Sequence, residues 1–357
     1  MKAAVFYKKH DLKIEEIKKP EPGPGEVLIK VMACGICGTD VHIFEGDEGA
    51  AATPAGTVLG HEFSGIIEKT GDGVTAFKAG DRVTVDPNKL CGKCSYCRSG
   101  IGHFCENIIG IGTTVNGGFS EYCAVPESQV YKIADTTSFS EAAMCEPVAC
   151  CLHGIDLCGI TSGDTVAVIG CGMIGMIMIQ LAKISGAAKI IAIEPDEKKL
   201  KKAKELGADI VIDPVKEDAG EVIKSYALGA GKLRTIFRVI LPNALGGIFA
   251  SVVLTIGRIV GESAALIFTA GNFSYMIFGL TAPGDTIKVK PFELFKKEIT
   301  IKASYINPYT QGRALALIDG KRIDVSSMVK TEKLTDLPGI LADRTKRSAK
   351  VIICPNE

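Results

Sequence analysis

Four cysteines near residue 100 form the motif that points most directly to a metal. Cys91, Cys94 and Cys97 are separated by two residues each, and Cys105 follows after a short loop. Thiolates at this spacing can surround one tetrahedral zinc ion, and a site filled by four protein ligands has no open position for catalysis. Because the intervening residues are charged or polar, four buried small side chains are the weaker interpretation. We predict a structural zinc site in a lobe at about residues 88–108.

A second group of residues could hold a zinc ion with one open position. Cys37 lies in Gly35–His42, and His61 is followed directly by Glu62. One thiol, one imidazole and one carboxylate leave a coordination position free, through which zinc can polarise an alcohol oxygen and favour the alkoxide. Taken singly, His61 could also be a core or loop histidine whose hydrogen bonds are made within the protein, and Cys37 could be a buried thiol.

A carboxylate further along the chain strengthens the metal interpretation. Glu146 lies within the apolar stretch Ala142–Cys151, where a charge is costly unless it is paired or bound to a metal. Its alternative role is that of an acid at a helix N-terminus before Pro147, where the helix macrodipole favours negative charge.

A glycine-rich turn predicts a dinucleotide site. The apolar run Thr165–Ile169 indicates a central parallel strand and Met176–Ser185 a helix, with a G-x-G-x-x-G pattern between them. Its glycines allow a sharp turn, a close approach to a pyrophosphate and tight helix packing, while the helix N-terminus attracts phosphate. A purely structural glycine turn is the alternative. The residues predicted to bind the cofactor here are Gly170, Gly172, Met173, Ile174 and Gly175.

The next strand, Lys189–Ile193, ends at an acidic residue, Glu194. A carboxylate at that place can accept hydrogen bonds from both ribose hydroxyls and would repel a 2′-phosphate, so we predict NAD over NADP. Lys198 and Lys199 are near enough in sequence to keep NADP open.

The overall composition excludes several classes of protein. Of the 357 residues, 41 are Lys or Arg and 41 are Asp or Glu, so no net field favours nucleic acid or an anionic membrane surface. The N-terminal residues lack the apolar segment of a signal peptide. Without an export signal, thirteen cysteines favour reduced thiols and metal ligands over disulfides. We expect a cytoplasmic protein.

Together these motifs resemble the zinc-dependent medium-chain alcohol and polyol dehydrogenases, over residues 1–224 and 276–357. The resemblance implies an α/β chain with a GroES-like, β-rich catalytic domain at 1–150 and 308–357. It implies a Rossmann domain, a doubly wound parallel sheet, at 151–307. A homodimer or homotetramer is also implied, commonly through the edge strand Thr300–Tyr305.

The resemblance also implies roles for individual residues. Cys37, His61 and Glu146 occupy catalytic zinc-ligand positions, and Glu62 lies beside the metal and exchanges with Glu146 in some members. Thr39 matches the hydroxyl that takes the substrate proton, and His42 the outer end of its relay through the cofactor ribose. The ligands of the structural zinc in the lobe are Cys91, Cys94, Cys97 and Cys105.

A carboxylate at position 146 resembles the sorbitol and threonine dehydrogenase branches of this family. Ser304 and Tyr305 stand where sorbitol dehydrogenases usually have Arg-Tyr, so polyols, vicinal diols and secondary alcohols all stay open as substrates. We expect a zinc-dependent oxidoreductase that transfers hydride between a small alcohol and NAD, with one catalytic and one structural zinc.

Residues 226–271 depart from the family pattern and make the second half of the Rossmann domain atypical. They resemble part of the permease subunit of phosphate ABC importers, and Leu245–Gly271 has membrane-spanning length. Arg258 and Glu262 interrupt that stretch, and charges at mid-bilayer are costly. We therefore do not expect a membrane protein. Nucleic acid is not expected as a partner either.

Two interpretations of this segment remain open. Either the chain is a catalytically impaired zinc-binding chimera that carries a permease-derived segment, or the segment is accommodated in the Rossmann sheet. In the second case we expect Thr235–Leu241 as the fourth strand, a long helix at Ala244–Phe268 and a fifth strand at Tyr275–Gly279.

Overall fold

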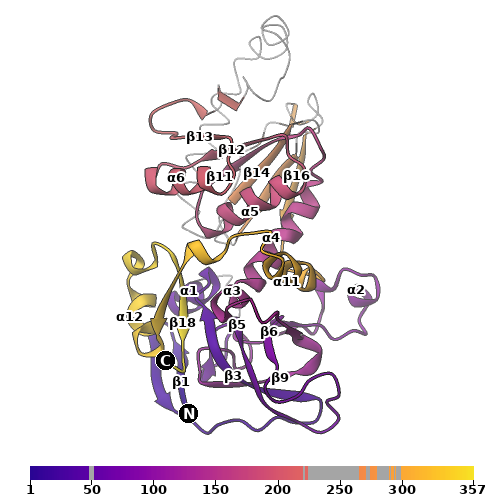
Figure 1. The fold of residues 1–357 in the computed structure, drawn as a ribbon, viewed down its shortest axis with the longest axis vertical. Coiled ribbons are helices and arrows are strands. Elements are labelled where there is room, and N and C mark those ends of the chain that lie inside the picture. Colours follow the sequence, from indigo (N-terminus) through magenta and orange to yellow (C-terminus); the bar gives the residue numbers. More distant parts are fainter. Residues whose placement is uncertain are drawn as a thin grey trace, which may run out of the picture. The chain divides into compact units, whose positions relative to one another are not determined.

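The structure is a computed structural model, and its chain divides into two units (Figure 1). The first unit consists of Met1–Cys150 and Ile306–Glu357, and the second of Cys151–Tyr305. The structure describes residues 1–47, 52–219, 222–223, 265–270, 274–279, 289, 291–292, 294 and 299–357.

A mostly antiparallel sheet forms the core of the first unit. Its strands are β10 (Val130–Lys132), β6 (Arg82–Val85), β5 (Glu62–Thr70), β3 (Glu26–Gly35), β18 (Lys350–Cys354) and β17 (Val329–Lys333), in that order, and β9 (Tyr122–Pro126) also pairs with β3. The C-terminal strand β18 thus lies between β3, from the start of the chain, and β17. Residues far apart in sequence therefore meet at the ends of β3 and β18, which pair antiparallel.

Smaller sheets and short helices complete this unit. The remaining strands are β2 (Asp11–Glu16), β1 (Lys2–Lys8) and β4 (Thr57–Val58) in one sheet, and β7 (Asn88–Lys89) and β8 (Ile109–Gly110) in another. The helices are α1 (Gly38–Glu45), α2 (Ser95–Arg98), α3 (Phe139–Ala143), α11 (Gln311–Asp319), α12 (Leu337–Ala342) and the start of α4 (Cys145–Cys158).

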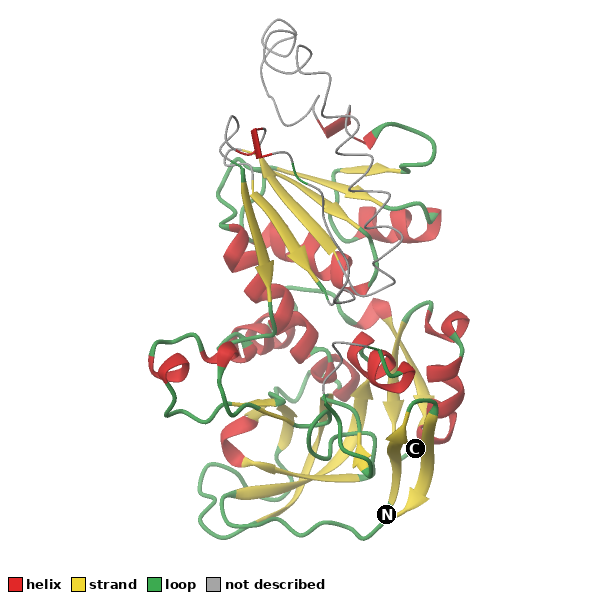
Figure 2. Ribbon diagram, turned by 180° about the vertical axis from the view of Figure 1, so that it is seen from behind, coloured by secondary structure: helices red, strands yellow, loops and turns green. Residues whose placement is uncertain are grey.

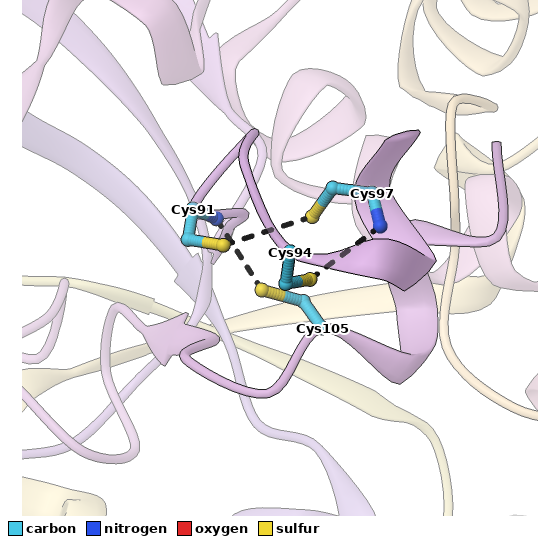
Figure 3. Close-up of side chains that lie close together, drawn as sticks. All are labelled: Cys91, Cys94, Cys97 and Cys105. Carbon is cyan, nitrogen blue, oxygen red and sulfur yellow. Dashed lines mark hydrogen bonds between the residues drawn. The ribbon is translucent and has the colours of Figure 1, made fainter. Parts of the chain in front are cut away.

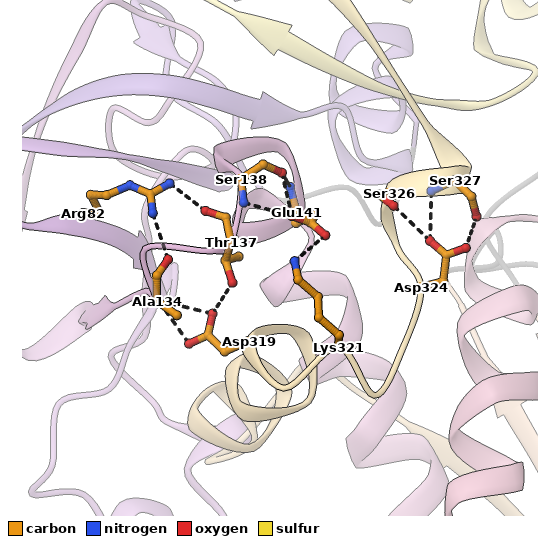
Figure 4. Close-up of polar contacts among 10 residues, drawn as sticks. All are labelled: Arg82, Ala134, Thr137, Ser138, Glu141, Asp319, Lys321, Asp324, Ser326 and Ser327. Carbon is orange, nitrogen blue, oxygen red and sulfur yellow. Dashed lines mark hydrogen bonds and ion pairs between the residues drawn. The ribbon is translucent and has the colours of Figure 1, made fainter.

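A polar clasp ties the returning C-terminal segment to the first half of this unit (Figure 4). The carboxylate of Asp319 accepts hydrogen bonds from the Thr137 hydroxyl at 2.6 Å and the Ala134 backbone N–H at 3.3 Å. Arg82 donates to the carbonyls of the same two residues, and Lys321 pairs with Glu141 at 2.7 Å. The clasp holds the loop before α3 and α4 against the end of α11.

The second unit is built on one sheet with helices packed against it (Figure 2). The strand order is β13 (Ile210–Ile212), β12 (Lys189–Ile193), β11 (Thr165–Ile169), β14 (Ala265–Ala270), β15 (Ser274–Phe278) and β16 (Thr300–Ser304). Helices α5 (Met173–Ile184) and α6 (Glu197–Glu205) contact β11, β12 and β13. Because β11 and β12 are almost entirely buried, they appear in the sequence as continuous apolar runs. This is the strand order of a Rossmann sheet.

One strand runs against the direction of the others. The strands β11, β12 and β13 are parallel, but β14 pairs antiparallel with both β11 and β15. The atypical second half that the sequence predicts is therefore a mixed sheet. The predicted fifth strand is confirmed as β15.

The prediction of a long helix at Ala244–Phe268 is wrong for its last four residues, because β14 begins at Ala265. The strand contains Leu266, Ile267, Phe268 and Thr269, which include the β-branched and aromatic types that favour strands. The backbone N–H and C=O groups of β11 on the side away from β12 also need hydrogen-bonding partners, which β14 supplies. The predicted strand at Thr235–Leu241 and most of the permease-like segment lie outside the described residues. Among the helices within the described ranges, none is long and apolar enough to cross a bilayer.

Candidate functional site

The four cysteines of the predicted lobe come together in the structure (Figure 3). All four sulfur atoms lie within 4.8 Å of one another, and the sulfurs of Cys91 and Cys97 are 4.0 Å apart. Tetrahedral zinc with Zn–S bonds of 2.3 Å requires sulfur separations of roughly 3.8 Å. The set of Cys91, Cys94, Cys97 and Cys105, here named the lobe cluster, therefore fits a zinc ion without rearrangement of the chain.

Local backbone amides favour thiolates in the lobe cluster. Hydrogen bonds from the backbone N–H groups of Lys93 and Cys94 lower the pKa of Cys91 to about 6. The backbone N–H of Cys97 donates to the sulfur of Cys94 at 3.5 Å and lowers the pKa of Cys94. Desolvation and then the neighbouring Cys94 thiol raise the pKa of Cys97 to about 12. The last thiolate thus needs a cation beside it, which a zinc ion supplies.

The second group of ligands also converges. Cys37 is the residue before α1, and His61 and Glu62 stand at the start of β5. One ligand atom from each of Cys37, His61 and Glu62 lies within 4.8 Å of the others. This set is here named the buried cluster, because the histidine and the glutamate are 6% and 1% exposed. It provides one thiol, one imidazole and one carboxylate, which is a donor set that zinc accepts.

A buried lysine compensates the charge of Glu62. The Nζ atom of Lys350, on β18, forms an ion pair with Glu62 Oε2 and donates to the Ile36 carbonyl at 2.7 Å. Burial lowers the pKa of Lys350, but Glu62, Cys37 and Asp40 together outweigh burial and leave the pKa above its ordinary value. Gly35 stands opposite Glu62 in the strand register, and a Cβ there would lie 2.2 Å from Glu62 Oε2. Only glycine leaves room for this pair.

The histidine of the buried cluster faces a second acid. Its Nδ1 atom lies 3.6 Å from Oδ1 of the fully buried Asp40, which is too long for a hydrogen bond but close enough for strong attraction. Burial lowers the pKa of His61, yet the charges of Asp40 and Cys37 raise it well above the ordinary value. With Nδ1 facing Asp40, Nε2 is left for an ion, as in many metal-binding histidines. Within the described residues, His61 Nδ1 and Glu62 Oε1 have no hydrogen-bond partner.

Glu146 lies close to the buried cluster without being part of it. Burial, and then the charge of Glu62, raise the pKa of Glu146 to about 7, while His61 attracts the ionised form. Its Oε1 accepts a hydrogen bond from the Cys150 thiol at 3.2 Å, one turn further along α4. The carboxylate that the structure groups with Cys37 and His61 is thus Glu62, and Glu146 is the nearby acid.

The two predicted relay residues both lie on α1. The Thr39 hydroxyl is 3.7 Å from the Cys37 sulfur. His42 is one-third exposed, and its Nδ1 is 2.8 Å from Oδ2 of Asp47. Since they are three residues apart on one helix, their side chains lie along the same face. The structure therefore places the hydroxyl next to the buried cluster and the imidazole toward solvent.

The glycine turn of the second unit has the shape that a pyrophosphate requires. Gly170 adopts a φ of 89°, which disfavours other residues, and a Cβ at Gly175 would lie 1.9 Å from the Gly170 carbonyl oxygen. Gly172 precedes α5 and offers no side chain to the first N–H groups of the helix, which can then bind an anion. Met173 and Ile174 form the first turn of α5.

Glu194 faces this turn from the end of β12. Its Oε2 accepts a hydrogen bond from the Cys171 backbone N–H at 2.9 Å, and its Oε1 accepts from the Asp196 backbone N–H at 3.3 Å. The side chain is 9% exposed. The carboxylate is therefore held beside the turn, where the ribose of a dinucleotide lies in Rossmann folds.

Asp40 and Lys350 are functional candidates that sequence reasoning missed. Asp40 lies three residues after Cys37, but an acid in a polar segment has no distinctive pattern. Lys350 opens the fully buried strand β18, so a lone lysine at the start of an apolar run was the available signal. Its partner Glu62 is nearly 290 residues earlier, and sequence spacing cannot connect the two.

Comparisons with known proteins agree with this geometry. Residues 23–135 match the family model of the alcohol dehydrogenase GroES-like domain, and residues 174–319 match that of the zinc-binding dehydrogenases. The chain is 43% identical to an L-threonine 3-dehydrogenase from Caldanaerobacter subterraneus over 63% of its own length and 65% of the relative's length. It is 35% identical to a sorbitol dehydrogenase from Halalkalibacterium halodurans, over 88% and 87% of the two chains.

A solved structure extends the likeness to the whole chain. A protein from Sinorhizobium meliloti described as a zinc-binding dehydrogenase, with NADP bound, superimposes with a TM-score of 0.82 at 32% identity, and the match covers 99% of both chains. These matches do not favour the interpretation as an impaired chimera. The combination of a GroES-like β unit, a Rossmann sheet and two ligand clusters identifies the family, and the chain belongs to the zinc-dependent medium-chain alcohol and polyol dehydrogenases.

Proposed function

We propose that the protein oxidises a secondary alcohol or polyol with NAD, and that the buried cluster is its catalytic metal site. The observation that carries this proposal is the convergence of Cys37, His61 and Glu62 with Glu146 close by. Three protein ligands leave a position open, and zinc in such a site supplies the Lewis acid that makes an alcohol easier to deprotonate. We propose that Glu146, whose pKa responds to the charges of His61 and Glu62, can replace Glu62 as the carboxylate ligand.

The residues around the buried cluster orient its ligands. Asp40 holds the His61 ring, and Lys350 restrains Glu62 and balances its charge. Such partners fix the direction in which a ligand presents its donor atom, and their loss typically weakens metal binding. We assign them a positioning role.

The proton of the alcohol leaves through side chains of α1 in this proposal. The Thr39 hydroxyl lies next to the buried cluster, where it can take the substrate proton and pass one on. His42, on the same face and open to solvent, delivers the proton to water.

The second unit supplies the cofactor site. The turn at Gly170–Gly175 presents backbone N–H groups for the pyrophosphate, with Met173 and Ile174 in the first helical turn. The carboxylate of Glu194 accepts the ribose hydroxyls and disfavours a 2′-phosphate, which supports NAD as the cofactor. When bound, NAD supplies the hydride acceptor.

The same proposal assigns a role to each domain, an oligomeric state and a cellular compartment. The segments 1–150 and 308–357 form the catalytic domain, 151–307 forms the cofactor domain, and the lobe cluster holds a structural zinc ion. We propose a cytoplasmic homodimer or homotetramer joined through β16, an exposed edge strand. Thirteen free thiols suit a reducing compartment.

A substrate panel tests the function. Purified protein is incubated with zinc, NAD and a series of alcohols that includes L-threonine, sorbitol, 2,3-butanediol and a polyol phosphate, and NADH formation is followed at 340 nm (about the NADH absorbance maximum). We expect turnover with a secondary alcohol. Folded, zinc-loaded protein that forms no NADH with any of them would contradict the proposal. Calorimetric NAD binding that survives Glu194→Ala would contradict the assigned role of that residue.

A further inference from the structure

We propose that Asp47 is a positioning residue for His42, which fixes the tautomer of the imidazole and completes the exit for the proton. This inference rests on the proposed function, because it concerns the outer end of the proton path. It adds a residue that neither the motifs nor the family comparisons point to. The basis is the way in which α1 ends.

The backbone at the end of α1 brings Asp47 next to His42. Gly46 has φ 65° and ψ 37°, its N–H donates to the Ile43 carbonyl at 3.1 Å, and the Asp47 N–H donates to the His42 carbonyl at 3.0 Å. These two bonds define a Schellman motif. The position of Asp47 is therefore set by hydrogen-bonded backbone and not only by a flexible side chain.

The side chains complete the contact. His42 Nδ1 and Asp47 Oδ2 are 2.8 Å apart, with the two side chains 33% and 51% exposed. An ionised carboxylate only accepts hydrogen bonds, so Nδ1 must carry the proton. In the neutral ring, Nε2 is then the free acceptor. The pairing thus selects the tautomer that can receive a proton at Nε2.

The proton count balances along this path. The alcohol loses one proton to the Thr39 hydroxyl, which passes one proton onward, and His42 takes it at Nε2. The resulting imidazolium faces the carboxylate of Asp47 and lies in the last turn of α1. One proton then passes to water, which both partly exposed side chains contact, and His42 returns to the same tautomer. No electrons move in these steps.

A second pair, between the last residue of α1 and His10, provides a matched control. Glu45 Oε2 lies 2.6 Å from His10 Nε2, and these side chains are 37% and 54% exposed. The pair has the same chemistry and similar exposure, but His10 stacks against Phe44, with ring centroids 5.4 Å apart, and has no place in the proton path. Glu45→Ala therefore tests whether loss of any surface histidine partner has an effect.

The first experiment needs no turnover. Protein with 15N-labelled histidine is studied by long-range 15N–1H NMR, with the His42 signals assigned by His42→Ala. We expect neutral His42 to carry its proton on Nδ1, and in Asp47→Ala to shift toward the Nε2–H tautomer. An Nε2–H tautomer in the unmodified protein, or no change in Asp47→Ala, would overturn the proposal. An enzyme inactive on every alcohol would count against the proposed function and leave this result valid.

The second experiment measures the consequence for proton transfer. Asp47→Ala should lower kcat about tenfold and increase the solvent deuterium isotope effect, with the NAD dissociation constant unchanged. Glu45→Ala should leave kcat unchanged. In a double-mutant cycle, Asp47→Ala should have no further effect in a His42→Ala background. A full loss in that background, or an unchanged kcat in Asp47→Ala alone, would show that Asp47 does not act through His42.

Discussion

The lobe cluster and the buried cluster stabilise their ligands in opposite ways. In the lobe cluster, all four cysteines come from one stretch of 15 residues, and the backbone amides of that stretch favour the thiolates. In the buried cluster, Cys37 and His61–Glu62 come from separate elements, and the compensating charges come from the side chains of Asp40 and Lys350. One site is local and mostly half-exposed, and the other is assembled and desolvated.

The difference shows when a charged ligand can be stabilised by its own segment of the chain and when it needs a side chain from elsewhere. Water and neighbouring N–H groups can solvate the lobe thiolates, so this site needs little from the rest of the protein. Burial removes that option from Glu62 and His61, and each then depends on one oppositely charged side chain. A substitution of one charged residue in or beside the buried cluster should therefore destabilise the protein more than a substitution in the lobe cluster.

The largest expected effect separates catalysis from structure. His61→Ala should remove one zinc ion per chain and lower kcat by about 10³-fold or more, because the Lewis acid is lost. Cys94→Ser should also remove one zinc ion per chain, but mainly lower the melting temperature. Elemental analysis, NADH formation and calorimetry measure the three quantities. A Cys94→Ser protein that is folded, keeps one zinc and is inactive would break the comparison.

Loss of the buried lysine tests the dependence of Glu62 on its partner. Lys350→Met should cost about 3–5 kcal/mol of unfolding free energy, because it leaves a buried carboxylate uncompensated. Urea unfolding of the zinc-free protein measures this cost. Lys69→Met is the control, since Lys69 pairs with Glu21 at a similarly short distance, 2.7 Å, but at the surface, where a pair contributes less than about 1 kcal/mol. Equal costs for the two variants would refute the distinction.

Asp86, a partly buried acid between the two clusters in the sequence, predicts a pH dependence. Asp86 follows β6 and precedes β7, and burial raises its pKa to about 6. Because the folded-state pKa lies above the ordinary value of 3.8, the folded protein binds this proton more tightly. The stability that the group contributes is present below about pH 4 and is lost as the pH rises through about 6.

Asp86→Asn should therefore gain stability relative to the unmodified protein as the pH rises from 4 to 8. The relative gain should approach about 3 kcal/mol, from a pKa difference of about two units. The amide can still accept the hydrogen bond from the Asn88 N–H, which is 3.0 Å from the carboxylate. Unfolding free energies at a series of pH values test this. A difference that is constant with pH would show that Asp86 is not the group responsible.

The smallest expected effect probes the space around Glu62. Gly35→Ala should cost about 1–3 kcal/mol, because its Cβ would lie 2.2 Å from Glu62 Oε2 and 3.0 Å from Lys350 Cε. Gly312→Ala, on α11, is the control, since its nearest neighbour would be 3.7 Å away. Thermal unfolding measures both. A Gly35→Ala protein as stable as the control would mean that the pair can move aside.

Regular elements of the second unit could be predicted from the sequence where burial is complete. The strands β11 and β12 are apolar runs bounded by the glycine turn and by Glu194, and the helix α5 follows directly. The direction of β14 could not be predicted in this way, because an apolar, β-branched run looks the same whether its neighbour runs parallel or antiparallel. A helix was the expectation there because length and hydrophobicity do not distinguish a helix from a buried strand.

The sequence by itself determined the lobe cluster, since two-residue spacing within one short loop places thiols around one point whatever the rest of the chain does. It also determined the glycine turn, where the backbone conformation of Gly170 and the close packing at Gly175 demand these residues. Tertiary structure alone decided that Lys350 supports Glu62, that Asp40 faces His61, and that β14 runs antiparallel. Those outcomes depend on strand pairing and on charges from distant parts of the sequence, such as Lys350 and Glu62. Coulomb attraction depends on distance in space and not on distance along the chain.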